Sequence, residues 1–177
     1  MTTSRVLAAA LAIAALASAA PLPAAAADYP TLRNGQWELT TTNSISGGAP
    51  RKMTLCLDAS TQKAMLDMSV GMQKELCNRS DMRREGSRYI TDAECKLGES
   101  VIKSHGVMAM TGDTAYRFES SATYDPPLMK DVRESKSVIE GRHTGACRDG
   151  LQPGDMVTPG GRTINLNQLP RPPAQGK

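Results

Sequence analysis

The four cysteines of this 177-residue chain limit its fold more than any other feature of the sequence. They are Cys56, Cys77, Cys95 and Cys147, and 20, 17 and 51 residues separate them in turn. Structural zinc sites usually draw their ligands from close pairs such as C-x2-C, so these gaps do not favour zinc. An even number of widely spaced cysteines predicts two disulfides if the chain is exported.

The N-terminal region has the pattern of a secretory signal peptide. A short leader containing Arg5 precedes an apolar run of about fifteen residues, which is shorter than the roughly 20 residues of a membrane span. Small residues at Ala25 and Ala27 fit the A-x-A cleavage pattern. We therefore expect residues 1–27 to be removed as a signal peptide, and the mature protein to work outside the cytoplasm with no membrane span.

The charge pattern argues against a nucleic-acid partner. The formal net charge is +3, and removal of Arg5 with the leader lowers it to +2. The densest basic cluster, residues 79–88, is interrupted by Asp81 and Glu85. One tryptophan, one phenylalanine and four tyrosines offer little surface on which bases could stack.

Period-two alternation of apolar and polar residues predicts several strands joined by short turns. Between the second and third strands, Asp58 can cap a helix that ends before Cys77. We predict an α+β fold: a mainly antiparallel, curved β-sheet meander of about seven strands with one helix after strand two and two disulfides. The predicted strands are residues 36–42, 53–57, 78–84, 88–96, 99–110, 114–124 and 135–147.

The composition changes after Cys147. Residues 148–177 are rich in proline and glycine and show no sustained periodicity, which predicts a disordered C-terminal tail. The folded unit is then a single β-rich domain over residues 28–147. In the alternative reading, Ile164, Leu166 and Leu169 form a docked strand.

Four motifs together resemble one protein family. They are Gly35-Gln36-Trp37, Cys56-Leu57-Asp58, the pair Cys77 and Cys95, and Gly141-Arg142-His143-Thr144-Gly145-Ala146-Cys147. Their order and spacing resemble the domain of unknown function 3617 family (DUF3617), small exported proteins of Gram-negative bacteria. The resemblance covers residues 32 to about 155 and implies a periplasmic (or secreted) disulfide-bearing β-rich domain. It implies no activity and no functional residue.

Four non-cysteine residues of these motifs are assigned structural roles, namely Gly35, Trp37, Gly141 and Gly145. Trp37 should be buried beside Leu39, Leu55 and Phe118. The closing glycines either let a neighbouring side chain such as that of Trp37 cross their strand closely or bend that strand.

Two disulfide pairings remain open. We prefer Cys56–Cys77 with Cys95–Cys147, which would close the loop that contains the helix and tie the last strand to the hairpin of residues 78–96. In the alternative, Cys77 and Cys95 face each other across a hairpin centred on Gly86, which leaves Cys56 for Cys147.

No catalytic, cofactor-binding or metal-ligating residue is assigned from the sequence. The chain has two histidines, His105 and His143, but no Gly-x-Ser-x-Gly motif whose serine either could activate as a general base. Met65, Met68 and Met72 share one helix face, which predicts a core face. Alternatively, their thioethers are ligands for Cu(I).

These observations favour a non-catalytic binding protein. Its partner would be an envelope protein or an apolar small molecule held in the concavity of the sheet. The alternatives are a periplasmic protein that handles Cu(I) through its methionines and a hydrolase with an unrecognised site.

Overall fold

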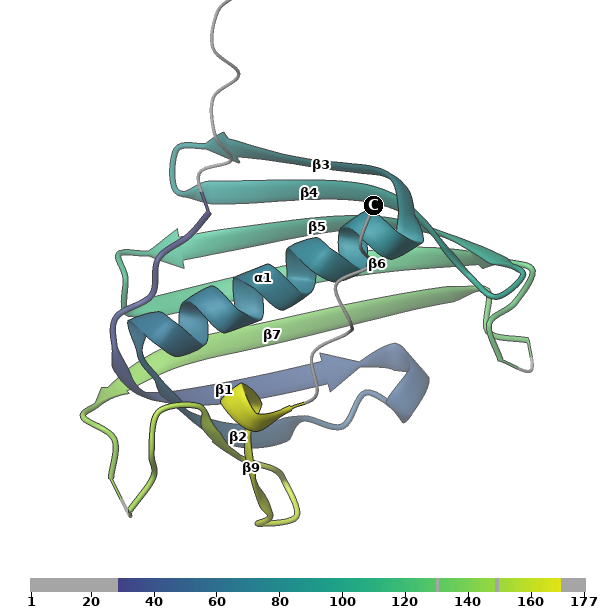
Figure 1. The fold of residues 1–177 in the computed structure, drawn as a ribbon. Coiled ribbons are helices and arrows are strands. Elements are labelled where there is room, and N and C mark those ends of the chain that lie inside the picture. Colours follow the sequence, from purple (N-terminus) through teal and green to yellow (C-terminus); the bar gives the residue numbers. More distant parts are fainter. Residues whose placement is uncertain (1–28, 130, 149, 170–177) are drawn as a thin grey trace, which may run out of the picture.

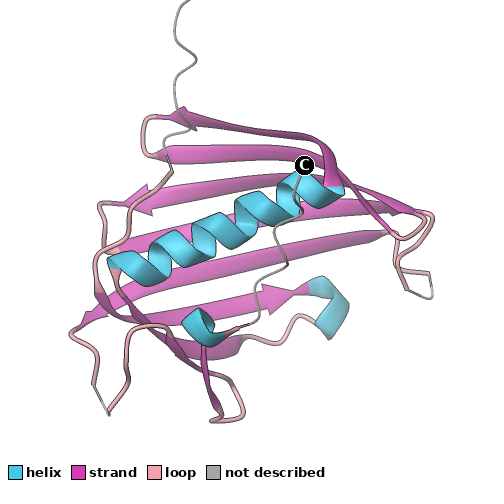
Figure 2. Ribbon diagram, viewed as in Figure 1, coloured by secondary structure: helices cyan, strands magenta, loops and turns pink. Residues whose placement is uncertain are grey.

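The computed structural model describes residues 29–129, 131–148 and 150–169; the predicted leader, residues 1–27, and the last eight residues, 170–177, lie outside this part. In the described ranges, nine strands form one antiparallel sheet, and one α-helix lies across a face of that sheet (Figures 1 and 2). The α+β class, the antiparallel sheet and the helix after strand two are thereby confirmed, with nine strands in place of about seven. Within the described ranges, no helix combines the length and apolar character that a membrane crossing requires.

The sheet is a meander extended by the N-terminal hairpin. Its strands are β1 (Gly35–Asn43), β2 (Arg51–Leu57), β3 (Cys77–Glu85), β4 (Arg88–Leu97), β5 (Ser100–Thr111), β6 (Ala115–Asp125), β7 (Glu134–Gly145), β8 (Asp155–Val157) and β9 (Thr163–Asn165). Their spatial order is β3-β4-β5-β6-β7-β1-β2-β8-β9. The helices are α1 (Ala59–Leu76) and two short 3-10 turns, η1 (Ser44–Ser46) and η2 (Leu166–Gln168).

The central strands carry different side chains on their two faces because successive residues of a strand point to opposite sides. We call the face toward α1 on β5, β6, β7 and β1 the inner face and the opposite one the outer face. The strand pairing assigns each residue to a face. The inner face of these four strands has no aspartate, glutamate, lysine or arginine, whereas the outer face carries Arg117, Glu119, Lys136 and Glu140. The inner-face residues are Ser100, Ile102, Ser104, Gly106, Met108, Met110, Tyr116, Phe118, Ser120, Ala122, Tyr124, Ser135, Ser137, Ile139, Gly141, His143, Trp37, Leu39, Thr41 and Asn43.

Helix α1 begins where the sequence predicts. The Asp58 side chain is its N-cap and accepts hydrogen bonds from the Thr61 amide at 2.7 Å and the Thr61 hydroxyl at 2.6 Å. Hydrogen bonds from Thr61 lower the pKa of the Asp58 carboxyl. The helix ends at Leu76, directly before Cys77.

The two disulfides are Cys56–Cys147 and Cys77–Cys95. Two bridges were expected, but the preferred pairing is wrong and the alternative is correct. Helix α1 has 18 residues and so spans about 27 Å. It separates Cys56 from Cys77 too widely for a bridge, which needs Cα atoms within about 7 Å. Cys77 instead faces Cys95 on the neighbouring strand β4.

Trp37 is the centre of the core, with 1% of its surface exposed. It packs with Leu55 and Leu57, and half-buried residues surround this cluster. Leu39 and Leu55 are neighbours as expected, but the rings that contact Trp37 are those of Tyr116, at 5.9 Å between centroids, and His143, in place of the expected Phe118. The half-buried residues are Leu32, Leu39, Tyr116, Met156 and Leu166.

Two of the glycines permit close packing beside Trp37. The Tyr116 ring lies over Gly141, where a Cβ atom would overlap it. Tyr116 therefore occupies the crossing position that the sequence suggested for Trp37. Gly35 has a φ of 127°, and a Cβ there would overlap the carbonyl oxygen of Gly145.

The expected disorder of the C-terminal tail is wrong for its described part. Strand β8 pairs with β2 and strand β9 pairs with β8. Met156 and Leu166 pack on the Trp37 cluster, and the Asn167 amide donates to the hydroxyl of Thr61 in α1. Strands of three residues are too short to produce the periodicity that sequence analysis relies on.

Truncation after Asp155 should therefore destabilise the protein. Relative to a reference chain that ends at Leu169, we expect a loss of at least about 2 kcal/mol, because Met156 and Leu166 are removed from the core. Chemical denaturation of the two chains measures the difference. Equal midpoints would show that β8 and β9 contribute nothing to stability.

Gly141→Ala should destabilise the fold by about 1–3 kcal/mol, because the added methyl group meets the Tyr116 ring. The same change introduced into Tyr116→Ala should cost much less, since the ring is then absent. Denaturation of both single variants and the double variant gives the coupling. Additive effects would contradict the assigned contact.

Candidate functional site

An apolar cavity of about 140 Å³ lies between α1 and the inner face. Residues from the N-terminal segment, from strands β1, β2, β5 and β6, and from the first half of α1 form its walls. They are Pro30, Leu32, Trp37, Leu39, Leu55, Leu57, Gln62, Met65, Met108 and Tyr116. The sequence predicted the burial of Trp37 but did not indicate that Met108, Tyr116 and Gln62 would meet around one cavity.

Gln62 fixes the N-terminal segment, residues 30–34, to the helix. Its amide nitrogen donates to the carbonyl oxygen of Leu32 at 2.9 Å and to the side-chain oxygen of Asn34 at 3.1 Å. Its amide oxygen accepts from the Leu32 N–H at 2.9 Å. Because these bonds occupy the polar atoms of Gln62, the cavity presents mainly carbon surface to an occupant.

The same segment is attached to the core and to the β5–β6 turn. The Trp37 indole N–H donates to the carbonyl oxygen of Arg33 at 2.8 Å. The Arg33 guanidinium forms two hydrogen bonds with the Asp113 carboxylate, which lower the pKa of that carboxyl. The wall of the cavity is therefore held independently of any ligand.

Helix α1 itself is packed loosely. Thr61 is its one buried residue among those described. Met65, Met68 and Met72 are 39%, 39% and 47% exposed, so their interpretation as a core face is wrong. A single helix cannot cover a nine-stranded sheet, and these three side chains, spaced at i, i+3 and i+7, form a partly exposed stripe on one face of α1. We call them the methionine stripe, of which Met65 also lines the cavity.

His105 lies on the outer face, away from the cavity. Its Nδ1 lies 2.7 Å from one Asp92 oxygen, and Arg83 donates to the other at 2.8 Å. The hydrogen bond with His105 contributes most to lowering the pKa of the Asp92 carboxyl, and the hydrogen bond from Arg83 contributes next. The strand register places Ser121 next to His105, so one row across three strands holds the residue types of a hydrolytic triad.

Besides a triad, acyl-transfer chemistry requires hydrogen-bond donors that stabilise the oxyanion of the tetrahedral intermediate, and this row lacks them. Strand β6 lies between β5 and β7, so the backbone N–H groups around Ser121 point into ladders on both sides. The His105 and Asp92 side chains are also 51% and 41% exposed, which leaves water in contact with the row. The geometry does not favour a hydrolase.

His143 has a structural position on the inner face. Its Nε2 is 3.0 Å from the Asn34 carbonyl oxygen, and its ring meets the Trp37 ring edge-on at 5.8 Å between centroids. It thus contributes to holding the N-terminal segment. It has no contact with a free thiol, because Cys147 is in a disulfide.

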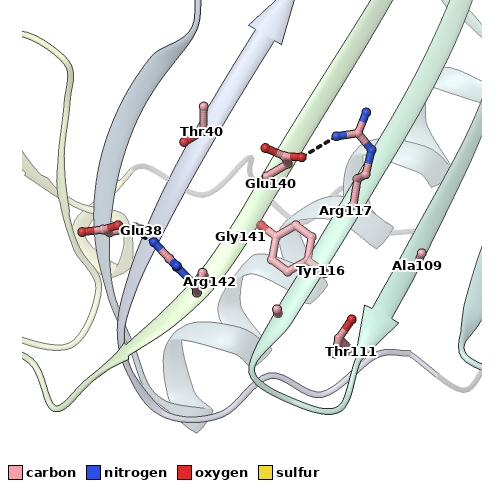
Figure 3. Close-up of a pocket in the computed structure, with 10 residues that line it drawn as sticks. Glu38, Thr40, Ala109, Thr111, Tyr116, Arg117, Glu140, Gly141 and Arg142 are labelled. Atoms are coloured by element: carbon pink, nitrogen blue, oxygen red, sulfur yellow. Dashed lines mark hydrogen bonds and ion pairs between the residues drawn. The ribbon is translucent and has the colours of Figure 1, made fainter.

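A hollow of about 410 Å³ lies on the outer face and has several charged side chains in its lining (Figure 3). Its charged side chains are paired with one another: Arg117 with Glu140, and Arg142 with Glu38 at 3.7 Å. Arg117 also binds Glu119, and the two carboxylates raise the pKa of its guanidinium. These exposed pairs satisfy the charges of the hollow, so it offers less binding energy than its volume suggests.

Metal ligands are not gathered at any described position. In the described parts of the chain, no three or more His, Cys, Asp or Glu side chains are placed to hold an ion. Met65 and Met108 both line the apolar cavity, whereas Met68 and Met72 do not.

Comparison of the chain with curated proteins and with solved structures finds no match. Residues 32–147 match the family described as "Protein of unknown function (DUF3617)". The matched region runs from the N-terminal segment to Cys147 and so contains β1 to β7, helix α1 and both disulfides. Because this region is more than half of the chain, the protein belongs to the DUF3617 family.

Proposed function

We propose that this protein is a non-catalytic binding protein that holds an apolar small molecule between α1 and the inner face. The apolar cavity beside Trp37 is the observation that carries the proposal. The signal-peptide pattern and the two disulfides support a location in the periplasm or outside the cell. A small molecule is preferred over an envelope protein because the cavity lies beneath the helix.

The size of the cavity sets the affinity that it can supply alone. At about 30 Å³ for a water-sized group, 140 Å³ holds about five methylene groups. Burial of each contributes about 0.8 kcal/mol, which gives about 4 kcal/mol and a dissociation constant of roughly 1 mM. A ligand of biological affinity therefore extends out of the cavity and contacts the methionine stripe.

Met65→Gln should weaken the binding of an apolar dye such as N-phenyl-1-naphthylamine. Met65 lines the cavity and is 39% exposed, so the polar replacement changes the cavity wall without disturbing a buried core. We expect the affinity to fall about fivefold or more, the equivalent of about 1 kcal/mol. Dye fluorescence and energy transfer from Trp37, the sole tryptophan, measure the binding.

Met129→Gln is the matched control, because Met129 is 55% exposed in the segment between β6 and β7 and does not line the cavity. It should leave the affinity unchanged. A protein that binds no apolar dye, or two variants with equal losses, would contradict the proposed site.

A further inference from the structure

The cavity is too small to enclose a whole drug-sized ligand. Pockets that enclose drug-sized molecules have volumes of about 300–1,000 Å³. A volume of about 140 Å³ accepts the end of a chain, and the rest of that chain must leave along α1. The flexible thioethers of the methionine stripe can adapt to such a chain along the length of the helix.

Beyond the cavity, the inner face changes from apolar to hydroxyl-bearing. The strand register places Ser120 beside Ser137 on β7 and beside Gly106 on β5. Ser104 lies two residues further along β5, and Thr41 on β1 pairs with Ile139, two residues from Ser137. Thr41, Ser137, Ser120 and Ser104 therefore form a diagonal line across β1, β7, β6 and β5, which we call the hydroxyl line.

The hydroxyl groups of the line have no hydrogen-bond partner within the described residues, and the three serines are the partly exposed members. The Thr41 hydroxyl oxygen is buried and has no partner. Among the described residues, the hydroxyls of Ser104, Ser120 and Ser137 have no side-chain hydrogen bond either, and these residues are only half-buried. Nearby, the hydroxyls of Tyr124 and Ser135 bind each other at 2.7 Å, so that pair is already satisfied.

The distance from cavity to hydroxyl line fits one extended chain. Ser120 is four residues beyond Tyr116 on β6, which at about 3.3 Å per residue is about 13 Å. No acidic or basic side chain lies on the inner face between these positions. A charged head group would lose its hydration there without gaining a counter-charge, whereas a neutral one can bond to the hydroxyls.

From these observations we infer that the ligand is a single-chain amphiphile with an uncharged, hydrogen-bonding head group, of the chemical class of a monoacylglycerol. The end of its chain lies against Trp37 and Met108, its middle runs beneath the methionine stripe, and its head binds the hydroxyl line. This inference rests on the proposed function and specifies its ligand.

The test compares three probes with the same chain: monolauroylglycerol, laurate and dodecyltrimethylammonium, each below its micelle concentration. Titration calorimetry gives the affinity, and Trp37 fluorescence reports the position of the chain. The neutral probe should bind at least about tenfold more tightly than either charged one, because the head of each charged probe is desolvated without a partner.

Ser120→Ala combined with Ser137→Ala should weaken monolauroylglycerol binding about tenfold, as expected for two lost hydrogen bonds, and leave dye binding unchanged. Ser121→Ala is the matched control, because Ser121 is adjacent to Ser120 but the alternation of the strand directs its side chain to the outer face, in register with His105. Far-ultraviolet circular dichroism and thermal melting verify that each variant is folded.

The outcomes separate the two proposals. If the dye binds but all three amphiphiles have equal affinity, or the double serine variant binds monolauroylglycerol as the unmodified protein does, this inference is wrong and the apolar site stands. If neither the dye nor any amphiphile binds, both proposals are wrong.

Discussion

The attachment of helix α1 at both ends is the constraint on which the rest of the structure depends. Cys56 lies three residues before the first residue of the helix and Cys77 directly follows its last. One disulfide ties the first end to Cys147 beyond β7, and the other ties the second end to β4. Each bridge contributes about 2–4 kcal/mol, mainly by restricting the unfolded chain. The helix therefore stays over the sheet although Thr61 is its one buried residue among those described.

Covalent attachment leaves the middle of the helix free of the close packing that normally holds a helix on a sheet. A tightly packed interface would fill the space beside Trp37 with side chains. Here the N-terminal segment, anchored by Gln62 and Asp113, forms the wall instead, and an apolar cavity remains. The charged outer face keeps the opposite side of the sheet solvated. Its exposed ion pairs contribute little to stability.

Much of the fold could be predicted from local sequence. Alternation identified the long strands because each has one apolar and one polar side, and the Asp58 cap located the start of α1. The tail was misjudged because β8 and β9 have three residues each, and their pairing depends on the distant strand β2. The preferred disulfide pairing is wrong because 18 helical residues separate the ends of α1 by about 27 Å, a distance that depends on where the helix ends and not on the spacing of the cysteines alone. The cavity was not predictable, since it depends on which face of the sheet the helix covers.

The loose packing of the middle of α1, between its two covalently tied ends, is the central claim, and hydrogen–deuterium exchange measured by mass spectrometry tests it most directly. In the free protein, amides in the middle of α1, residues 64–72, should exchange much faster than those of β5, β6 and β7, and monolauroylglycerol or an apolar dye should slow them selectively. The ladder amides of the central strands should not respond. Protection of α1 equal to that of the sheet, unchanged by any apolar ligand, would contradict the account.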